Sequence, residues 1–169
     1  MQTAKRAAEE RLRRGRMSYT ILQPTFFTEV WLSPTLGFDP TNATARIYGS
    51  GQNKISWICV QDVAKFAVAA AGNPQANNSV VKLGGPDALS PLEVVRLAEA
   101  VTRRKFVVEH VPEDALKTQF DAASDSLQQS FAGLMLYYAR GDAIDMTKTL
   151  LRFPVHPLRS VREHLAAIT

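Results

Sequence analysis

Short segments rich in β-branched residues alternate with segments of helical periodicity along this chain, and that order limits the folds it can adopt. The expected strands are 18–22, 54–60, 79–83 and 105–111, and the expected helices are 3–14, 62–71, 91–102, 113–123, 127–140 and one after residue 160. Residues 33–45 are rich in Pro, Thr, Asn, Gly and Asp and are expected to form an irregular loop. Strands that alternate with helices predict an α/β fold.

Helix boundaries are signalled at several places. Ser90-Pro91-Leu92-Glu93 combines a serine N-cap, a proline at the first helical position and a glutamate that completes a capping box. Ser160 and Glu163 repeat the serine and glutamate of that box. Gly15 follows helix 3–14 and is expected to be its left-handed C-cap residue, and Asp62 is expected to cap the helix that it opens.

Length and composition exclude several classes of protein. The 169 residues suit one domain, and 46% hydrophobic with 21% charged residues excludes a mainly disordered chain. No uninterrupted apolar run approaches the roughly 18 residues of a membrane-spanning helix. Cys59 is the single cysteine, so an intrachain disulfide and a cysteine-cluster metal site are excluded, and we expect a cytoplasmic protein.

The net charge of +4 is concentrated at the N-terminus. Six of the first 16 residues are basic and two, Glu9 and Glu10, are acidic. The acidic residues argue against a transit peptide, and no aromatic residue lies among the basic ones as nucleic-acid stacking requires. We therefore expect a solvated helix face and neither a nucleic acid nor a membrane as partner.

Self-sufficient cofactor or metal motifs are missing from the sequence. The nearest approach to a dinucleotide-binding loop, Gly49-Ser50-Gly51, lacks the third glycine and the following helix, so a plain turn is expected. His110, His156 and His164 are dispersed, so no metal site is expected. Cys59 is interpreted as a small buried apolar residue.

A series of short motifs nevertheless occurs in a familiar order. The series comprises Lys5-Arg6-Ala7-Ala8-Glu9, Tyr19 to Phe27, Ile47-Tyr48-Gly49-x-Gly51, Lys54 to Ile58, Asp62-Val63-Ala64, Leu83 to Ser90 and Phe131-Ala132-Gly133. It resembles the C-terminal half of the NmrA-like branch of the atypical or extended short-chain dehydrogenase/reductase superfamily. The resemblance implies the C-terminal part of a Rossmann-like NAD(P)-binding fold, with a small, mostly helical substrate-side subdomain.

The same resemblance divides the chain into two parts. Residues 1–83 would hold the remaining Rossmann elements and a substrate-side insertion, and residues 84–169 the C-terminal helical subdomain. The glycine-rich nucleotide loop would precede Met1. We therefore expect NAD(P) as cofactor of the complete protein and no tight binding by this chain alone.

Lys5 matches the lysine of the family's Tyr-x-x-x-Lys helix, through its Lys-x-x-x-Glu context with Glu9. In the family that lysine binds the nicotinamide ribose and lowers the pKa of the acid tyrosine. The tyrosine position falls on Met1, so either the motif is cut or this relative never had it. The alternative for Lys5 is one more solvated charge.

Pro24, Thr25, Phe26 and Phe27 match the segment with which the family covers the nicotinamide. An aromatic side chain there can stack on the nicotinamide, and the alternative is that Phe26 and Phe27 belong to the core. Gln23 departs from the pattern, because arginine is common before the proline.

The resemblance implies a reductase of a small carbonyl or quinone-like substrate, and Trp57 is expected either to line the substrate cleft or to lie in the core. The alternatives are a non-enzymatic NAD(P)-sensing regulator that binds a partner protein, and an inactive truncated fragment. Because the rest of the sheet would be missing, we expect an apolar patch around Ile21, Leu22 and Val81. A missing N-terminal half, or self-association, would cover it.

Overall fold

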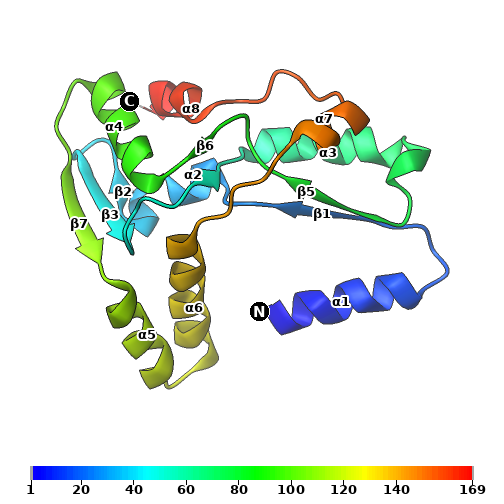
Figure 1. Cartoon of the computed structure of the whole chain (residues 1–169), viewed down its shortest axis with the longest axis horizontal. Helices are drawn as coiled ribbons and strands as arrows, with labels where there is room; N and C mark the ends of the chain where they lie inside the picture. The colour runs from blue at the N-terminus through cyan, green and yellow to red at the C-terminus, as the bar shows by residue number, and fades with distance from the viewer. Residues whose placement is uncertain (1, 169) are drawn as a thin grey trace.

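The computed structural model describes residues 2–168, and side chains from Ala4 onward, as an α/β fold (Figure 1). β1 (Thr20–Pro24) and β5 (Ser79–Leu83) pair in parallel, with Thr20 opposite Ser79 and Pro24 opposite Leu83. Two helices, α1 (Gln2–Arg14) and α3 (Val60–Ala71), lie on opposite sides of this pair in the view of Figure 1. The pair thus has the layered arrangement expected of a parallel sheet.

A second group of strands lies beyond the end of β1. Here β3 (Thr44–Tyr48) pairs in parallel with β7 (Val107–Val111) and antiparallel with β2 (Phe38–Asp39), while β4 (Ile55–Ser56) pairs with β6 (Ala88–Leu89). The remaining elements are α2 (Thr28–Trp31), the 3₁₀ turns Pro34–Leu36 and Pro74–Ala76, α4 (Pro91–Thr102), α5 (Glu113–Ala122), α6 (Ser126–Arg140), α7 (Thr147–Arg152) and α8 (Val161–Ile168). The α5–α6 hairpin projects away from the body of the fold (Figure 1).

Local capping signals are confirmed. Ser90 Oγ accepts from the Glu93 N–H at 3.2 Å, and the Glu93 carboxylate accepts from the Ser90 N–H at 2.7 Å. Ser160 and Glu163 form the same reciprocal pair before α8. Gly15 differs from the expectation: its N–H donates to Leu12 O at 3.0 Å, but its backbone is not left-handed.

The strand expected over 54–60 is wrong beyond its first residues. β4 ends at Ser56, because Ile58 instead pairs with the backbone of Phe27, and Cys59 becomes the N-cap of α3. Cys59 Sγ accepts from the Asp62 N–H at 3.4 Å, so Asp62 lies in the first turn and is not the cap. The loop expected over 33–45 is also partly wrong, since it contains β2 and the start of β3.

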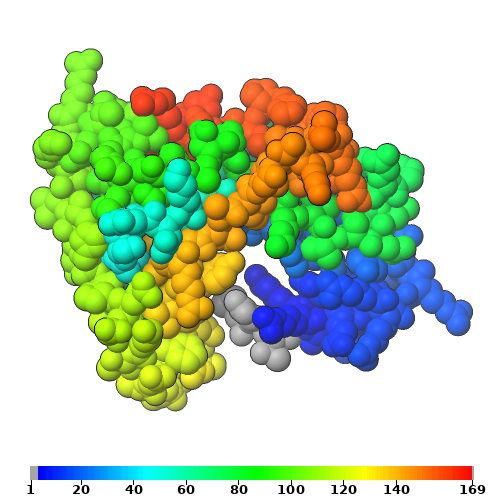
Figure 2. All heavy atoms as spheres, viewed as in Figure 1, coloured from blue at the N-terminus to red at the C-terminus, as the bar shows by residue number. Residues whose placement is uncertain are grey.

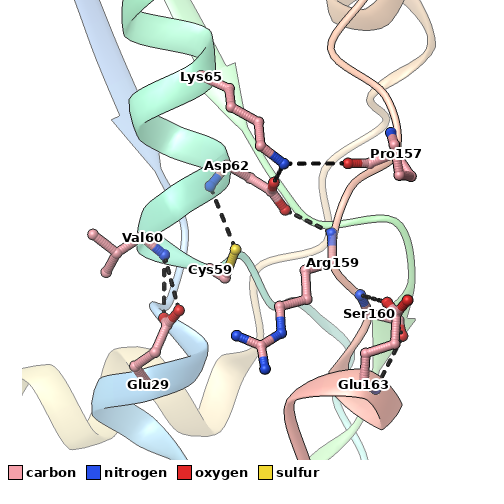
Figure 3. Close-up of polar contacts among 9 residues, drawn as sticks. All are labelled: Glu29, Cys59, Val60, Asp62, Lys65, Pro157, Arg159, Ser160 and Glu163. Carbon is pink, nitrogen blue, oxygen red and sulfur yellow. Dashed lines mark hydrogen bonds and ion pairs between the residues drawn. The ribbon is translucent and has the colours of Figure 1, made fainter. Parts of the chain in front are cut away.

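Asp62 instead connects α3 to a distant part of the chain (Figure 3). Its carboxylate accepts from Lys65 Nζ at 2.8 Å and from the Arg159 N–H at 2.7 Å. Burial alone raises the pKa of this carboxyl, but the bonds from Lys65 and Arg159 outweigh it and hold the pKa below the ordinary value. The Glu29 carboxylate of α2 accepts from the Val60 N–H at 3.1 Å and so gives a partner to a backbone donor that the first turn of α3 leaves unpaired.

The expected apolar patch is wrong for Val81, which is 4% exposed. Val81 packs in a core cluster with Phe66 of α3, because alternate residues of β5 face that helix. Ile21 and Leu22 are half-buried. None of the helices within residues 2–168 combines the length and the apolar character needed to cross a membrane.

Candidate functional site

The carboxyl end of β1 carries the segment that the sequence singles out. The Thr25 N–H donates to Leu83 O at 2.9 Å, and its hydroxyl donates to Ser56 O. Two residues later, Phe27 forms an isolated parallel bridge with Ile58. Segment 24–27 therefore leaves the β1–β5 pair and is fixed by backbone bonds at each step.

α1 is oriented over β1 by one hydrogen bond. Gln23 Nε2 donates to Glu9 Oε1 at 3.1 Å, and β1 runs back along α1 after the 15–19 connection (Figure 1). Lys5 precedes Glu9 by about one helical turn, on the same face, and therefore lies further toward the carboxyl end of β1. The side chain of Lys5 is exposed. The structure thus brings Lys5 and segment 24–27 to the same edge, while the tyrosine position at Met1 lies outside the described residues.

Phe26 lies in an aromatic cluster. It is 5% exposed, with its ring centroid 4.7 Å from that of Trp31 and 5.6 Å from that of Tyr138, both edge to face. The core interpretation therefore holds for Phe26. Phe27 is half-buried against the cluster that contains Phe66.

Trp57 also takes the core role. It is 1% exposed, and its indole N–H donates to Leu89 O at 2.9 Å. The indole is buried and its donor is satisfied, so Trp57 takes the core position, one of the two expected for it.

Tyr137 is a candidate that sequence reasoning missed. The residue is 44% exposed, and its ring stacks on Phe26, with centroids 5.8 Å apart and an interplanar angle of 30°. Burial and the hydrogen-bonded Asp142 carboxylate raise the pKa of this phenol. Asp142 is held by backbone bonds with Lys54 and Ser56, at 2.9 and 3.0 Å.

A second apolar stripe on α6 is the sequence pattern that could have identified Tyr137. Leu127, Phe131, Leu134 and Tyr137 recur every three or four residues and are all exposed. Tyr137 stacks on Phe26 and so lies on the side of α6 that faces the end of β1. Figure 2 shows the surface hollowed between α6 and α1, which we call the α1–α6 hollow.

Gly49 and Gly51 do not form a phosphate loop. Their backbones are left-handed, with φ of 75° and 68°, and a Cβ on them would meet Ala139 and Ile47 side chains at 2.7 and 2.5 Å. Both glycines are therefore packing positions in a plain turn, as predicted. Among the described residues, no three His, Cys, Asp or Glu side chains gather as metal ligands would.

Two relatives match part of the sequence, whereas no family model matches it. The chain is 30% identical over 123 residues to the isoflavone reductase homolog IRL of Zea mays, a match that covers 72% of this chain and 38% of that protein. It is 30% identical over 96 residues to an NAD(P)H azoreductase of Xenophilus azovorans, over 57% of this chain and 33% of that protein.

Solved structures show the same fold over nearly the whole chain. An NADPH-dependent quinone oxidoreductase of Escherichia coli superposes with a TM-score of 0.78 at 18% identity, covering 98% of this chain and 60% of that one. A leucoanthocyanidin reductase of Vitis vinifera, in complex with NADPH, gives 0.80 at 17% identity, covering 98% and 57%. The chain thus spans little more than half of these structures and about a third of the sequence relatives.

Proposed function

We propose that this chain supplies the nicotinamide-facing and substrate-facing part of an NAD(P)H-dependent reductase of the NmrA-like type, acting on a small carbonyl or quinone-like compound. The observation that carries the proposal is the convergence of Lys5 and segment 24–27 at the carboxyl end of β1. Ligands of open α/β sheets bind outside the carboxyl ends of the strands. The names of the relatives that use NAD(P)H support the cofactor.

The residues present fit one end of such a cofactor. Lys5 Nζ can donate charge-assisted hydrogen bonds to the hydroxyls of the nicotinamide ribose. The pyrophosphate end needs backbone N–H groups of a glycine-rich turn at a helix N-terminus, and the Gly49–Gly51 turn is filled by Ala139 and Ile47. This chain is therefore expected to hold the nicotinamide end and to leave the adenosine end to a nucleotide-binding half.

The substrate would lie in the α1–α6 hollow. When bound, the cofactor supplies a hydride. On the α6 side, Tyr137 presents its aromatic ring, and burial and the Asp142 carboxylate raise the pKa of its phenol above the ordinary value. The single O–H of this phenol is directed at Asp142, so Tyr137 would offer a quinone-like substrate its exposed aromatic ring, and exposed Leu134 would supply apolar surface that excludes water.

The test compares two cofactors on the full chain. Reduced nicotinamide mononucleotide and NADPH are titrated separately and followed by nicotinamide fluorescence, and quinone reduction is then followed at millimolar cofactor. We expect weak, saturable binding of the two cofactors with similar affinity, because the chain contacts only the nicotinamide riboside end that they share. Quinone-dependent oxidation of the cofactor should accompany binding.

Each other outcome decides between functions. Micromolar NADPH binding, much tighter than that of the mononucleotide, would show that the chain binds the whole dinucleotide. The assignment of only the nicotinamide end to this chain would then be wrong. Saturable binding without turnover of any carbonyl or quinone favours an NAD(P)-sensing regulator. Absence of binding by both cofactors at millimolar concentration overturns the proposal.

A further inference from the structure

A basic depression lies at the C-terminal end of α4 and shares no residue with the site at the end of β1. We call it the α4 hollow. It has a volume of about 330 Å³, is open to solvent, and is lined by Arg96, Glu99, Ala100, Arg103, Arg104 and Lys105. Four of these six side chains are cationic and one is anionic, so the lining carries a net charge of +3 in a chain whose net charge is +4.

The two cations best placed to act together are Arg96 and Arg103. Arg96 and Ala100 stand about one turn apart on one face of α4, and Arg103, the C-cap residue just beyond the helix, lines the same depression. The short side chain of Ala100 leaves space between the two long ones. In the described part of the chain, neither guanidinium forms a hydrogen bond or an ion pair. Glu93, one turn before Arg96, is engaged in the capping box with Ser90, and Arg96 acts on it through its charge alone.

The single carboxylate of the lining is also committed. Glu99 accepts from the Phe106 N–H at 3.0 Å and from Lys105 Nζ at 3.2 Å, and these bonds hold the pKa of Glu99 below its ordinary value. Arg104 is tied by its guanidinium to Thr41 O at 2.5 Å. Glu99 therefore balances Lys105, and Arg104 is held by a carbonyl oxygen, which leaves Arg96 and Arg103 as the two cations of the lining whose guanidinium groups can turn to a ligand.

The backbone at Arg103 is a second, independent observation. Arg103 is the C-cap of α4 and is left-handed, with φ of 56°, a position where glycine is the residue of lowest cost. A cation at a helix C-terminus is favoured by the macrodipole, which accounts for a basic residue in the last turn. It does not account for a left-handed backbone at an arginine that lines the same depression as Arg96.

We propose that the α4 hollow binds the phosphate group of a small soluble phosphate monoester, held between the guanidinium groups of Arg96 and Arg103. The planar fork of an arginine matches phosphate oxygens in bidentate geometry, and two such cations balance the dianion. The concave lining around Ala100 suits a compact group. No apolar side chain other than Ala100 lines the hollow, so it offers nothing to insert into a lipid surface.

The experiment titrates the full chain with inorganic phosphate and with phenyl phosphate at constant ionic strength, following backbone amides by NMR. We expect saturable shifts centred on residues 96–105. Arg96→Ala and Arg103→Gly should each weaken binding roughly tenfold, because each removes a charge-assisted contact. Arg103→Gly should also raise the thermal midpoint, since it relieves the left-handed side chain, so loss of binding cannot be attributed to unfolding.

Arg140→Ala is the matched control, because Arg140, like Arg103, is an exposed cation at the C-terminal end of a helix, in this case α6. Its affinity for phosphate should equal that of the wild type. Shifts that do not saturate, or equal losses in Arg140→Ala and Arg103→Gly, would reduce the hollow to general charge screening and overturn the proposal. Capture by vesicles containing a phosphatidylinositol phosphate, without saturable binding of phenyl phosphate, would overturn the assignment to a soluble ester.

Discussion

The carboxylate of Asp62 and the backbone N–H of Arg159 are 2.7 Å apart, although nearly a hundred residues separate them in the sequence (Figure 3). Asp62 is fully buried in the first turn of α3, and Arg159 precedes α8. The bond fastens the C-terminal segment to the helix that covers β1. Lys65 balances the buried charge from the same helix at 2.8 Å.

We expect Asp62→Ala to lower the free energy of unfolding by about 2–3 kcal/mol, because the Arg159 N–H and Lys65 lose a charged, buried acceptor. Asp114→Ala is the control, since Asp114 forms the same i,i+3 pair with Lys117 but is exposed. Its denaturation midpoint should not change. Equal effects of the two substitutions in urea denaturation would show that the Arg159 contact contributes nothing.

Gly85 is a position where the backbone of Trp57 leaves no space for a side chain. A Cβ on Gly85 would lie 1.7 Å from Trp57 O. We therefore expect Gly85→Ala to prevent the buried Trp57 from adopting its native position and to abolish cooperative thermal unfolding. Gly72→Ala should fold normally, because nothing lies within 4 Å of the Cβ that it would introduce. Normal tryptophan fluorescence and unfolding of Gly85→Ala would contradict the packing described.

His164 should make the folded state sensitive to mild acid. It is 5% exposed, and neither ring nitrogen is hydrogen-bonded to a residue that the structure describes. Burial lowers its pKa from the ordinary 6.5, although the Glu29 charge acts in the opposite direction. Below pH 6.5 the unfolded chain binds a proton that the folded chain does not, so stability falls as the pH falls.

Urea midpoints measured between pH 8 and pH 5.5 test this expectation. The decline should be smaller in His164→Leu than in the wild type, while His156→Ala, which changes an exposed histidine, should leave the slope unchanged. A wild-type slope retained in His164→Leu would assign the acid sensitivity to other groups.

Lys5→Ala should weaken binding of reduced nicotinamide mononucleotide about tenfold to hundredfold, the range for loss of charge-assisted hydrogen bonds. Arg11→Ala is the control in the same helix. Arg13 is less suitable, because its guanidinium pairs with Glu9, the residue that orients α1 against Gln23. Similar small losses for Lys5→Ala and Arg11→Ala in a fluorescence titration would leave Lys5 as an ordinary surface charge.

Features encoded by neighbouring residues could be predicted from the sequence. The Ser90–Glu93 box and the bounds of β5 depend on local chemistry, and both are confirmed. The segment after Ser56 could not be predicted in this way. Its alternation favours a strand, but the backbone partners that decide its course, Phe27 and Gly85, lie far away in the sequence.

The candidate site also combines features that neighbouring residues determine with features that depend on distant parts of the chain. The position of segment 24–27 at the end of a strand follows from proline after a β-branched run. The burial of Phe26 and the exposure of Tyr137 depend on where α6 packs, and helical periodicity within α6 cannot say which of its two apolar stripes is covered. Gln23 was a departure from the family pattern, and only the structure reveals its bond to Glu9.

The parallel pairing of β1 with β5 also bears on how the chain reaches this fold. The ladder between β1 and β5 forms only after residue 20 contacts residue 79. In the other sheet, residue 44 must likewise contact residue 107. The entropy of closing such long loops is lost before the pairing compensates it, so these ladders form slowly. The α5–α6 hairpin needs only neighbouring residues and is able to form first. During synthesis, the residues of β1 emerge long before their partner, and the exposed strand is then most vulnerable to pairing with another chain.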